Sequence, residues 1–177
     1  MKLVAISLLV FILCSCNSTT IYLVRHAEKV IEDNPDPSLT VEGFARAIDL
    51  KEALKEASID AIIVSDFQRT QLTAQPLSDF LGLQLIVIPL QEIGVEKYIQ
   101  DVVDEINNNW SGRNVLVVTH NPLFQQIGQR LNAPALSPIN NETGYDHFFV
   151  ITKSDKASVL STLSHTRYGA MPQNFSR

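Results

Sequence analysis

The chain has 177 residues, of which 45% are hydrophobic and 19% are charged, and its formal net charge is −5. This length fits a single domain. The hydrophobic fraction, with eight Phe, four Tyr and one Trp, excludes a disordered chain. Because 14 basic residues face 19 acidic ones, no basic surplus is present to hold a phosphate backbone. These numbers predict a globular domain that does not bind nucleic acid.

The first residues predict an export signal. Lys2 is followed by the apolar run Leu3–Leu13, interrupted only by Ser7. This run is too short to cross a bilayer as a helix, but it has the length of the apolar part of a secretory signal peptide. It ends in Leu13-Cys14-Ser15-Cys16, which resembles the lipobox of bacterial lipoproteins.

That resemblance implies a lipoprotein signal peptide over residues 1–15, a lipidated Cys16 with a short tether over 16–18, and a domain over 19–177. The protein would then attach to a membrane through lipid and lie in the cell envelope, facing the periplasm or the cell surface. An ordinary cleaved signal peptide or a short anchor helix is the alternative. Since Cys14 and Cys16 are the only cysteines, the domain has no thiol for a disulfide, a zinc site or catalysis.

Beyond this segment, short apolar runs alternate with amphipathic ones. In chain order, the pattern predicts strand 19–24, helix 40–57, strand 59–64, helix 68–81, strand 85–88, helix 97–110, strand 114–118, helix 122–131, and strands 146–152 and 158–165. Strands that alternate with helices indicate an α/β fold. We therefore expect a three-layer α/β/α sandwich around a mainly parallel sheet.

Local features refine this prediction. Thr40 is the expected N-cap of the first helix. The apolar face of that helix is expected to carry Val41, Phe44, Ala45, Ile48 and Leu54. In the second helix, Pro76 marks a kink or a restart. A long loop over 132–144 is expected to form a lid, and the last two strands are expected to be joined by a turn at 154–156.

Polar residues follow three of the predicted strands directly. Arg25 and His26 come after the first strand, Ser65-Asp66 and then Arg69 after the second, and His120-Asn121 after the fourth. Ligands of open α/β sheets bind beyond the carboxyl ends of the strands. The pattern therefore predicts that two arginines and two histidines meet at one end of the sheet.

Such a set suits an anion. Arginine presents planar, permanently charged donors that match phosphate oxygens, and a neutral imidazole is a competent nucleophile toward phosphorus. A metal site formed by His26, His120 and Glu28 is the alternative, but two guanidinium groups in the same cavity would repel a cation. Ser65 lacks the G-x-S-x-G context of a hydrolase nucleophile. We expect neither a metal ion nor an organic cofactor.

These residues carry a resemblance to a known family. Arg25-His26-Ala27-Glu28 resembles the signature of the histidine phosphatase superfamily, also called phosphoglycerate mutase-like. Further segments are similar to motifs of that family and follow in the same order: Pro37–Thr40 with Gly43 and Arg46-Ala47, Ser65–Thr70 with Thr73-Ala74 and Pro76-Leu77, Val117–Asn121, Tyr145–Phe149 and Arg167–Gly169. The resemblance spans nearly the whole predicted domain and implies a phosphoglycerate mutase-like fold.

The resemblance also implies roles. His26 would attack phosphorus and form a phosphohistidine, inside a phosphate pocket formed by Arg25, Arg69, His120 and Asn121. Catalysis would rest on His26, His120 and a general acid. Glu92 is the first candidate for the acid, because Leu90–Gly94 resembles the segment that holds it in larger relatives. Asp146, at the start of the fifth strand, is the other candidate.

We therefore expect a metal-independent phosphomonoesterase that acts outside the cytoplasm on small phosphate esters or envelope sugar phosphates. A non-catalytic lipoprotein that binds a phosphate ligand is one alternative, and a phosphoryl-transferring mutase is another. The remaining histidines, His147 and His165, lack a comparable context and are expected to be structural. The oligomeric state is left open by the sequence.

Overall fold

The structure, a computed structural model, describes residues 18–154 and 160–169, so the predicted signal peptide, Cys16 and part of the turn at 154–156 lie outside the described residues. Its elements in chain order are β1 (Ser18–Arg25), α1 (Val41–Leu54), β2 (Ala61–Ser65), α2 (Gln68–Leu81), β3 (Leu85–Ile88), α3 (Leu90–Asn109), β4 (Asn114–Thr119), α4 (Leu123–Arg130), β5 (His147–Ser154) and β6 (Thr162–Arg167). Every predicted strand and helix overlaps one of these elements. No helix in this part of the chain is long and apolar enough to span a membrane.

The strands form one six-stranded sheet in the order β3-β2-β4-β1-β5-β6. β1 is parallel to β4, and β2 is parallel to both β4 and β3. β5 runs antiparallel to β1, and β6 antiparallel to β5. The predicted α/β fold with a mainly parallel sheet is therefore confirmed, and the antiparallel part is confined to the last two strands.

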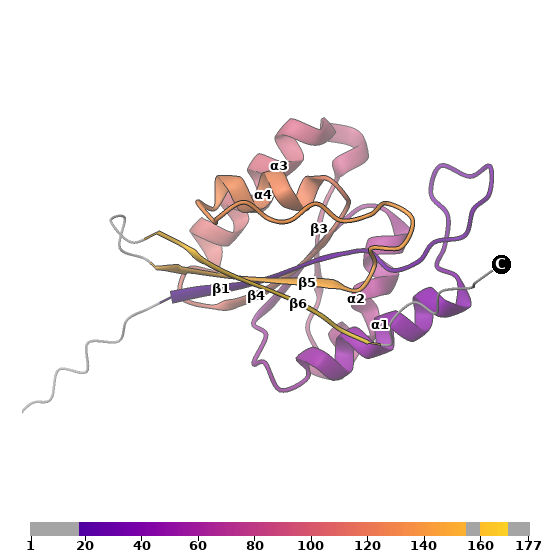
Figure 1. The fold of residues 1–177 in the computed structure, drawn as a ribbon, viewed down its shortest axis with the longest axis horizontal. Helices are drawn as coiled ribbons and strands as arrows, with labels where there is room; N and C mark the ends of the chain where they lie inside the picture. Colours follow the sequence, from indigo (N-terminus) through magenta and orange to yellow (C-terminus); the bar gives the residue numbers. More distant parts are fainter. Residues whose placement is uncertain (1–17, 155–159, 170–177) are drawn as a thin grey trace, which may run out of the picture.

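Helices cover both faces of the sheet, so the molecule has three layers (Figure 1). α3 and α4 lie over one face, where Phe124 and Tyr98 pack in the larger core with Leu23 of β1. α1 and α2 lie over the other, where Leu77 packs in a second core with Val24. Neighbouring residues of β1 thus point to opposite layers, as the two-residue period of a strand requires.

The predicted apolar face of α1 is wrong except at Leu54. The structure leaves Val41, Phe44 and Ile48 83%, 44% and 50% exposed, and Ala45 is exposed as well. The buried residues of α1 are Gly43, Arg46, Ala47, Leu50 and Leu54. A polar anchor helps to determine this rotation of the helix about its axis, as the contacts with Glu28 show.

Glu28 holds α1 from the loop after β1. Arg46 donates from Nε to both carboxylate oxygens of Glu28 at 2.8 Å, and its Nη2 lies 2.6 Å from Oε1. Gly43 sits against the Glu28 carbonyl, where a Cβ would lie 2.1 Å from the oxygen. The predicted N-cap is confirmed, since Thr40 Oγ1 accepts a hydrogen bond from the Gly43 amide at 3.1 Å. These contacts share the buried face with Ala47, Leu50 and Leu54, which pack in the apolar cores.

Other differences from the predicted elements have local causes. α3 begins at Leu90, earlier than predicted, and Gly94 interrupts it with φ 76° and ψ 169°. Only glycine adopts this conformation without strain, so the sequence carries two helical segments that meet at a sharp bend. α2 runs unbroken over Gln68–Leu81 with Pro76 inside it, so the proline begins no new helix.

Candidate functional site

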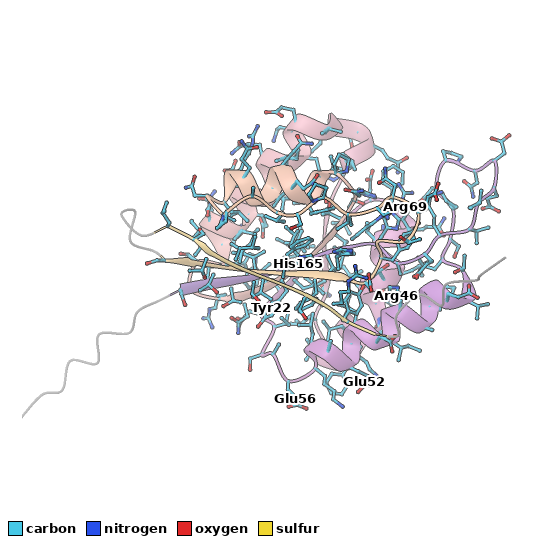
Figure 2. All side chains as sticks on the ribbon, in the orientation of Figure 1. Tyr22, Arg46, Glu52, Glu56, Arg69 and His165 are labelled. Atoms are coloured by element: carbon cyan, nitrogen blue, oxygen red, sulfur yellow. The ribbon has the colours of Figure 1, made fainter. Side chains whose placement is uncertain are left out.

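The carboxyl ends of β1, β2 and β4 lie side by side and bring the predicted residues together. Arg25 ends β1, and His26 follows it with its amide donating to the carbonyl of Thr119, the last residue of β4, at 2.9 Å. The rings of His26 and His120 lie 5.4 Å apart. Arg69 lies at the same end of the molecule as the loop that follows β1 (Figure 2).

His26 is held as a neutral, oriented imidazole. Its Nδ1 lies 2.8 Å from the Ala27 carbonyl oxygen, which can only accept, so Nδ1 carries the proton and Nε2 is free of one. The Ala27 amide in turn donates to Thr73 Oγ1 at 2.9 Å. Burial lowers the pKa of His26 well below its usual value, against the opposing effect of the Ala27 hydrogen bond, and the nearby His120 and arginines lower it further.

His120 is neutral as well. Its Nε2 lies 2.8 Å from Ser65 Oγ, and that hydroxyl lies 2.9 Å from Thr70 Oγ1. Burial, then the charges of Arg69 and Arg25, lower the pKa of His120 to about 3. The chain of hydroxyl groups fixes the ring without supplying a charge, so His120 can act as a neutral hydrogen-bonding group.

Arg25 and Arg69 are cations with few partners of opposite charge. Arg25 is 8% exposed, and its Nη1 donates to the Asn140 carbonyl at 3.4 Å. Arg69 has a side chain 13% exposed, and its Nη1 lies 3.8 Å from Asp36 Oδ1. The Nε atoms of both arginines are buried and make no hydrogen bond within the described residues. Burial lowers the pKa of both guanidinium groups, so an anion in the pocket would satisfy charge and hydrogen bonds together.

Asn121 lies beside this group but is turned toward the loop over 132–144. Its Nδ2 donates to the Ile139 carbonyl at 3.3 Å and also to Asn141 Oδ1. Because Arg25 donates to Asn140 in the same loop, the loop is fastened to the site at two points. Asn121 therefore positions the predicted lid in this structure, and its expected contact with phosphate stays a prediction.

The two predicted acids differ in surroundings. Glu92 is exposed in the first turn of α3. The backbone N–H of its neighbour Gln91 donates to both carboxylate oxygens of Asp66 at 3.3 and 3.2 Å. Asp146 is 1% exposed, and its Oδ2 lies 3.0 Å from Nη1 of Arg167. The start of α3 is thus fastened to the turn that precedes Arg69, whereas Asp146 is tied to β6.

Sequence reasoning missed several residues of the site. Ser65 fixes His120, Asp36 lies next to Arg69, and two aromatic rings, Phe67 and Tyr145, lie against the arginines, with the guanidinium carbons 4.0 Å from the ring centroids. Ser65 is a polar residue directly after the second strand, but the sequence does not assign it to the site, and Phe67 and Tyr145 stand in family-like motifs without a polar pattern that would mark them. Asp36 and Tyr145 reach the site from loops, where neither helical nor strand periodicity gives a position.

The predicted structural histidines lie elsewhere. His147 Nδ1 and His165 Nε2 are 2.8 Å apart on β5 and β6, and His165 lies at the front of the molecule in Figure 2. In the part of the chain that the structure describes, neither makes a hydrogen bond or a ring contact with His26 or His120. Within residues 18–154 and 160–169, no three of His, Cys, Asp and Glu are grouped where they could hold a metal ion.

Comparison with known proteins gives a consistent match. Residues 21–99 match the family model described as histidine phosphatase superfamily (branch 1). A "Probable phosphoglycerate mutase GpmB" of Escherichia coli O139:H28 is 32% identical over 130 residues, which cover 64% of this chain and 60% of that protein. Its counterpart in Enterobacter sp. (strain 638) is 33% identical over 96 residues, covering 48% and 45%. The chain thus spans between about half and three fifths of the length of these relatives.

Solved structures share the fold. The protein histidine phosphatase SixA complexed with tungstate superposes with a TM-score of 0.63 at 21% identity, covering 84% of this chain and 96% of that chain. A mycobacterial glucosyl-3-phosphoglycerate phosphatase gives a TM-score of 0.58 at 14% identity, covering 76% and 90%. At these identities the likeness concerns the fold, and the matched segment 21–99 contains three of the four residues that meet in the site.

Proposed function

We propose that the chain is a member of the histidine phosphatase superfamily (branch 1), whose family model matches residues 21–99, and that it is a phosphatase that hydrolyses phosphate monoesters through a phosphohistidine at His26. The observation that carries the proposal is the state of His26: a buried neutral ring, with Nδ1–H fixed by the Ala27 carbonyl at 2.8 Å, next to two arginines. A nucleophile toward phosphorus needs an unprotonated nitrogen and a neighbouring anion site, and this group supplies both.

The first step forms a bond between His26 Nε2 and phosphorus while the bond from phosphorus to the ester oxygen breaks. The positive charge that develops on the ring is stabilised by the hydrogen bond from Nδ1 to the Ala27 carbonyl. Arg25, Arg69 and neutral His120 donate to the phosphoryl oxygens, which carry the charge in the transition state. The ester oxygen leaves with a proton from the general acid.

The second step transfers the phosphoryl group to water. The acid, now a carboxylate, takes a proton from water as the water oxygen attacks phosphorus and the bond to Nε2 breaks. Inorganic phosphate is released and His26 returns to its neutral form. We assign the acid to Glu92 ahead of Asp146, because the hydrogen bonds from Gln91 to Asp66 hold the start of α3 near Arg69, whereas Asp146 already pairs with Arg167.

The chemistry of the donor set favours a reaction without a metal ion. Two guanidinium groups in one pocket repel a divalent cation, and they supply the positive charge that a metal would otherwise bring to the phosphoryl group. The tungstate in the SixA structure supports a phosphate-like anion as the ligand of this pocket.

For the substrate, we propose small phosphate esters or envelope sugar phosphates. The glucosyl-3-phosphoglycerate phosphatase among the structural neighbours supports a sugar phosphate, and the mutase relatives keep phosphoryl transfer between hydroxyl groups as the second candidate. We also propose that Cys16 carries a lipid that anchors the protein in the cell envelope. Support for the anchor comes from the lipobox-like Leu13-Cys14-Ser15-Cys16.

The decisive test is phosphate release from p-nitrophenyl phosphate between pH 4 and 8 with EDTA present, using the chain from Asn17 onward. We expect release by the wild type and a loss of at least about a thousandfold in His26→Ala. His165→Ala, which removes a histidine outside the site, serves as the matched control and retains activity. An aryl phosphate has a good leaving group, so a missing acid cannot explain a silent assay.

Other outcomes identify the alternatives. A wild type that binds inorganic phosphate by calorimetry but releases none from several esters would be a binding protein. Transfer of the phosphoryl group to a second hydroxyl, without net release, would identify a mutase. Activity that EDTA abolishes and zinc or magnesium restores would contradict the metal-independent mechanism.

A further inference from the structure

Each arginine of the site lies against an aromatic ring from a different segment. The guanidinium carbon of Arg25 is 4.0 Å from the centroid of the Tyr145 ring, and that of Arg69 is 4.0 Å from the centroid of the Phe67 ring. Phe67 occupies the N-cap position of α2, and Tyr145 lies in the loop just before β5. Two unrelated parts of the chain therefore build the same arrangement on the two arginines.

The same rings contact the two histidines. Tyr145 lies 6.0 Å from His26 between ring centroids, and Phe67 lies 5.2 Å from His120 in an edge-on geometry. With 5.4 Å between the histidines, the four rings form a row from Tyr145 through His26 and His120 to Phe67. Tyr145 and Phe67 thus lie at the two ends of this row, with the two histidines between them.

Few other contacts fix the orientation of the guanidinium planes of Arg25 and Arg69. Apart from Tyr145, whose hydroxyl also interacts with the guanidinium group, Arg25 has one long hydrogen bond, 3.4 Å to the Asn140 carbonyl. Arg69 has Asp36 at 3.8 Å, beyond hydrogen-bonding distance. The Nε of each arginine is buried without a hydrogen bond in the described structure. A guanidinium recognises phosphate through two parallel bonds in one plane, so a rotation of that plane weakens binding.

We propose that Tyr145 and Phe67 are positioning residues, each of which fixes the plane of one arginine so that its N–H groups meet the oxygens of a phosphoryl group. They act through Arg25 and Arg69, and the crossed arginine backgrounds of the test separate this role from their ring contacts with His26 and His120. The inference rests on the proposed function where turnover is concerned, but it applies to anion binding without turnover as well.

The test is a pair of double-mutant cycles on the full chain, read as the dissociation constant of inorganic phosphate by calorimetry. Tyr145→Leu and Phe67→Leu each weaken binding by about three- to thirtyfold, the range of a partly buried cation–π contact. Arg25→Lys and Arg69→Lys keep the charge but remove the planar donor. In the Arg25→Lys background, Tyr145→Leu costs less than about twofold, while in the Arg69→Lys background it keeps its full effect.

Phe67→Leu gives the corresponding result: its effect on the dissociation constant of phosphate is lost in the Arg69→Lys background and kept in the Arg25→Lys background. The conservative variants Tyr145→Phe and Phe67→Tyr retain the rings and restore binding to within about twofold of wild type. Phe80→Leu, on the exposed side of α2, removes an aromatic ring outside the site and leaves binding unchanged.

Two results overturn the inference: equal effects of each leucine variant in the matched and the crossed arginine backgrounds, or failure of the conservative variants to restore binding. Steady-state hydrolysis of p-nitrophenyl phosphate separates this inference from the proposed function. Coupled phosphate binding in a protein that hydrolyses no ester would refute the phosphatase and support the positioning role. A wild type that binds no phosphate overturns this inference, whereas the proposed function is decided by ester hydrolysis alone.

Discussion

Replacing His120 with glutamine tests how the pocket titrates. Burial and the two arginines lower the pKa of His120 from 6.5 to about 3. Between pH 6.5 and about 3, the His120 imidazole is therefore protonated in the unfolded chain but stays neutral in the folded chain. The free energy of unfolding falls as the pH drops from 6.5 toward 3, because protons bind more to the unfolded state.

The size of the effect follows from the shift. Between pH 7 and pH 4.5, the linkage relation gives a loss of about 2.5 kcal/mol from this single group. Glutamine does not titrate, so His120→Gln lacks this loss. Whatever the substitution costs at pH 7, the wild type is then expected to lose about 2.5 kcal/mol more than the variant on going to pH 4.5. The pKa of His26 is lowered in both proteins, mainly by burial, and His120→Gln removes only the contribution of His120 to that shift, so the difference between the proteins comes mainly from His120.

The measurement is urea unfolding followed by circular dichroism at pH 7, 5.5 and 4.5. Ser65→Ala is the matched control: it removes the 2.8 Å contact to His120 Nε2 but leaves the imidazole in place to titrate. Its stability is expected to fall in parallel with that of the wild type. Parallel curves for the wild type and His120→Gln would refute the view that His120 is buried and neutral in the folded protein.

Three further predictions concern the anchor of α1 and the acid. Arg46→Met leaves Glu28 without its partner and lowers the free energy of unfolding by about 3 kcal/mol in urea, whereas a loss below about 1 kcal/mol would mean that the pair does not hold the helix. Gly43→Ala places a methyl group against the Glu28 carbonyl and costs about 2 kcal/mol, with an unchanged stability as the contrary result. Glu92→Gln lowers kcat by about a hundredfold or more for an alkyl phosphate but less than about threefold for an aryl phosphate; equal effects on both substrates would exclude Glu92 as the acid.

The end of the sheet where the site lies could be predicted because two simple rules agree there. Apolar runs of strand length indicate where the strands are, and in a parallel sheet their carboxyl ends point the same way. Arg25, His26 and His120 stand directly after such runs, so their meeting needs only the correct strand order. Arg69 adds one turn of helix to the same argument.

The face of α1 could not be predicted, because the hydrophobic pattern assumes that apolar burial determines how a helix is rotated. Here the ion pair of Arg46 with Glu28, the close approach of Gly43 to the same residue and the burial of Ala47, Leu50 and Leu54 outweigh the four apolar side chains of the predicted face that stay exposed. A buried arginine paired with a carboxylate leaves no signature in a periodicity. Glu28, the partner of Arg46, can be identified only from the position of the loop after β1 in the folded chain.

The rings beside the arginines escaped prediction for a different reason. Phe67 and Tyr145 are ordinary apolar or half-polar residues in sequence, and an aromatic ring in a loop is usually part of a core. Their meaning comes from contacts over large sequence separations, such as that of Tyr145 with Arg25. The role of Asp36 is hidden in the same way, since its loop has no regular structure.

The direction of β1 has a practical consequence. Ser18 pairs with Ser154 at one end of the strand, and Arg25 pairs with Thr119 at the other, a separation of roughly 23 Å for eight residues in a strand. Whatever is joined to the amino end of the domain, whether lipid, resin or fused protein, therefore holds it by the end farthest from His26. A support linked through that end therefore lies at the opposite end of β1 from Arg25 and His26.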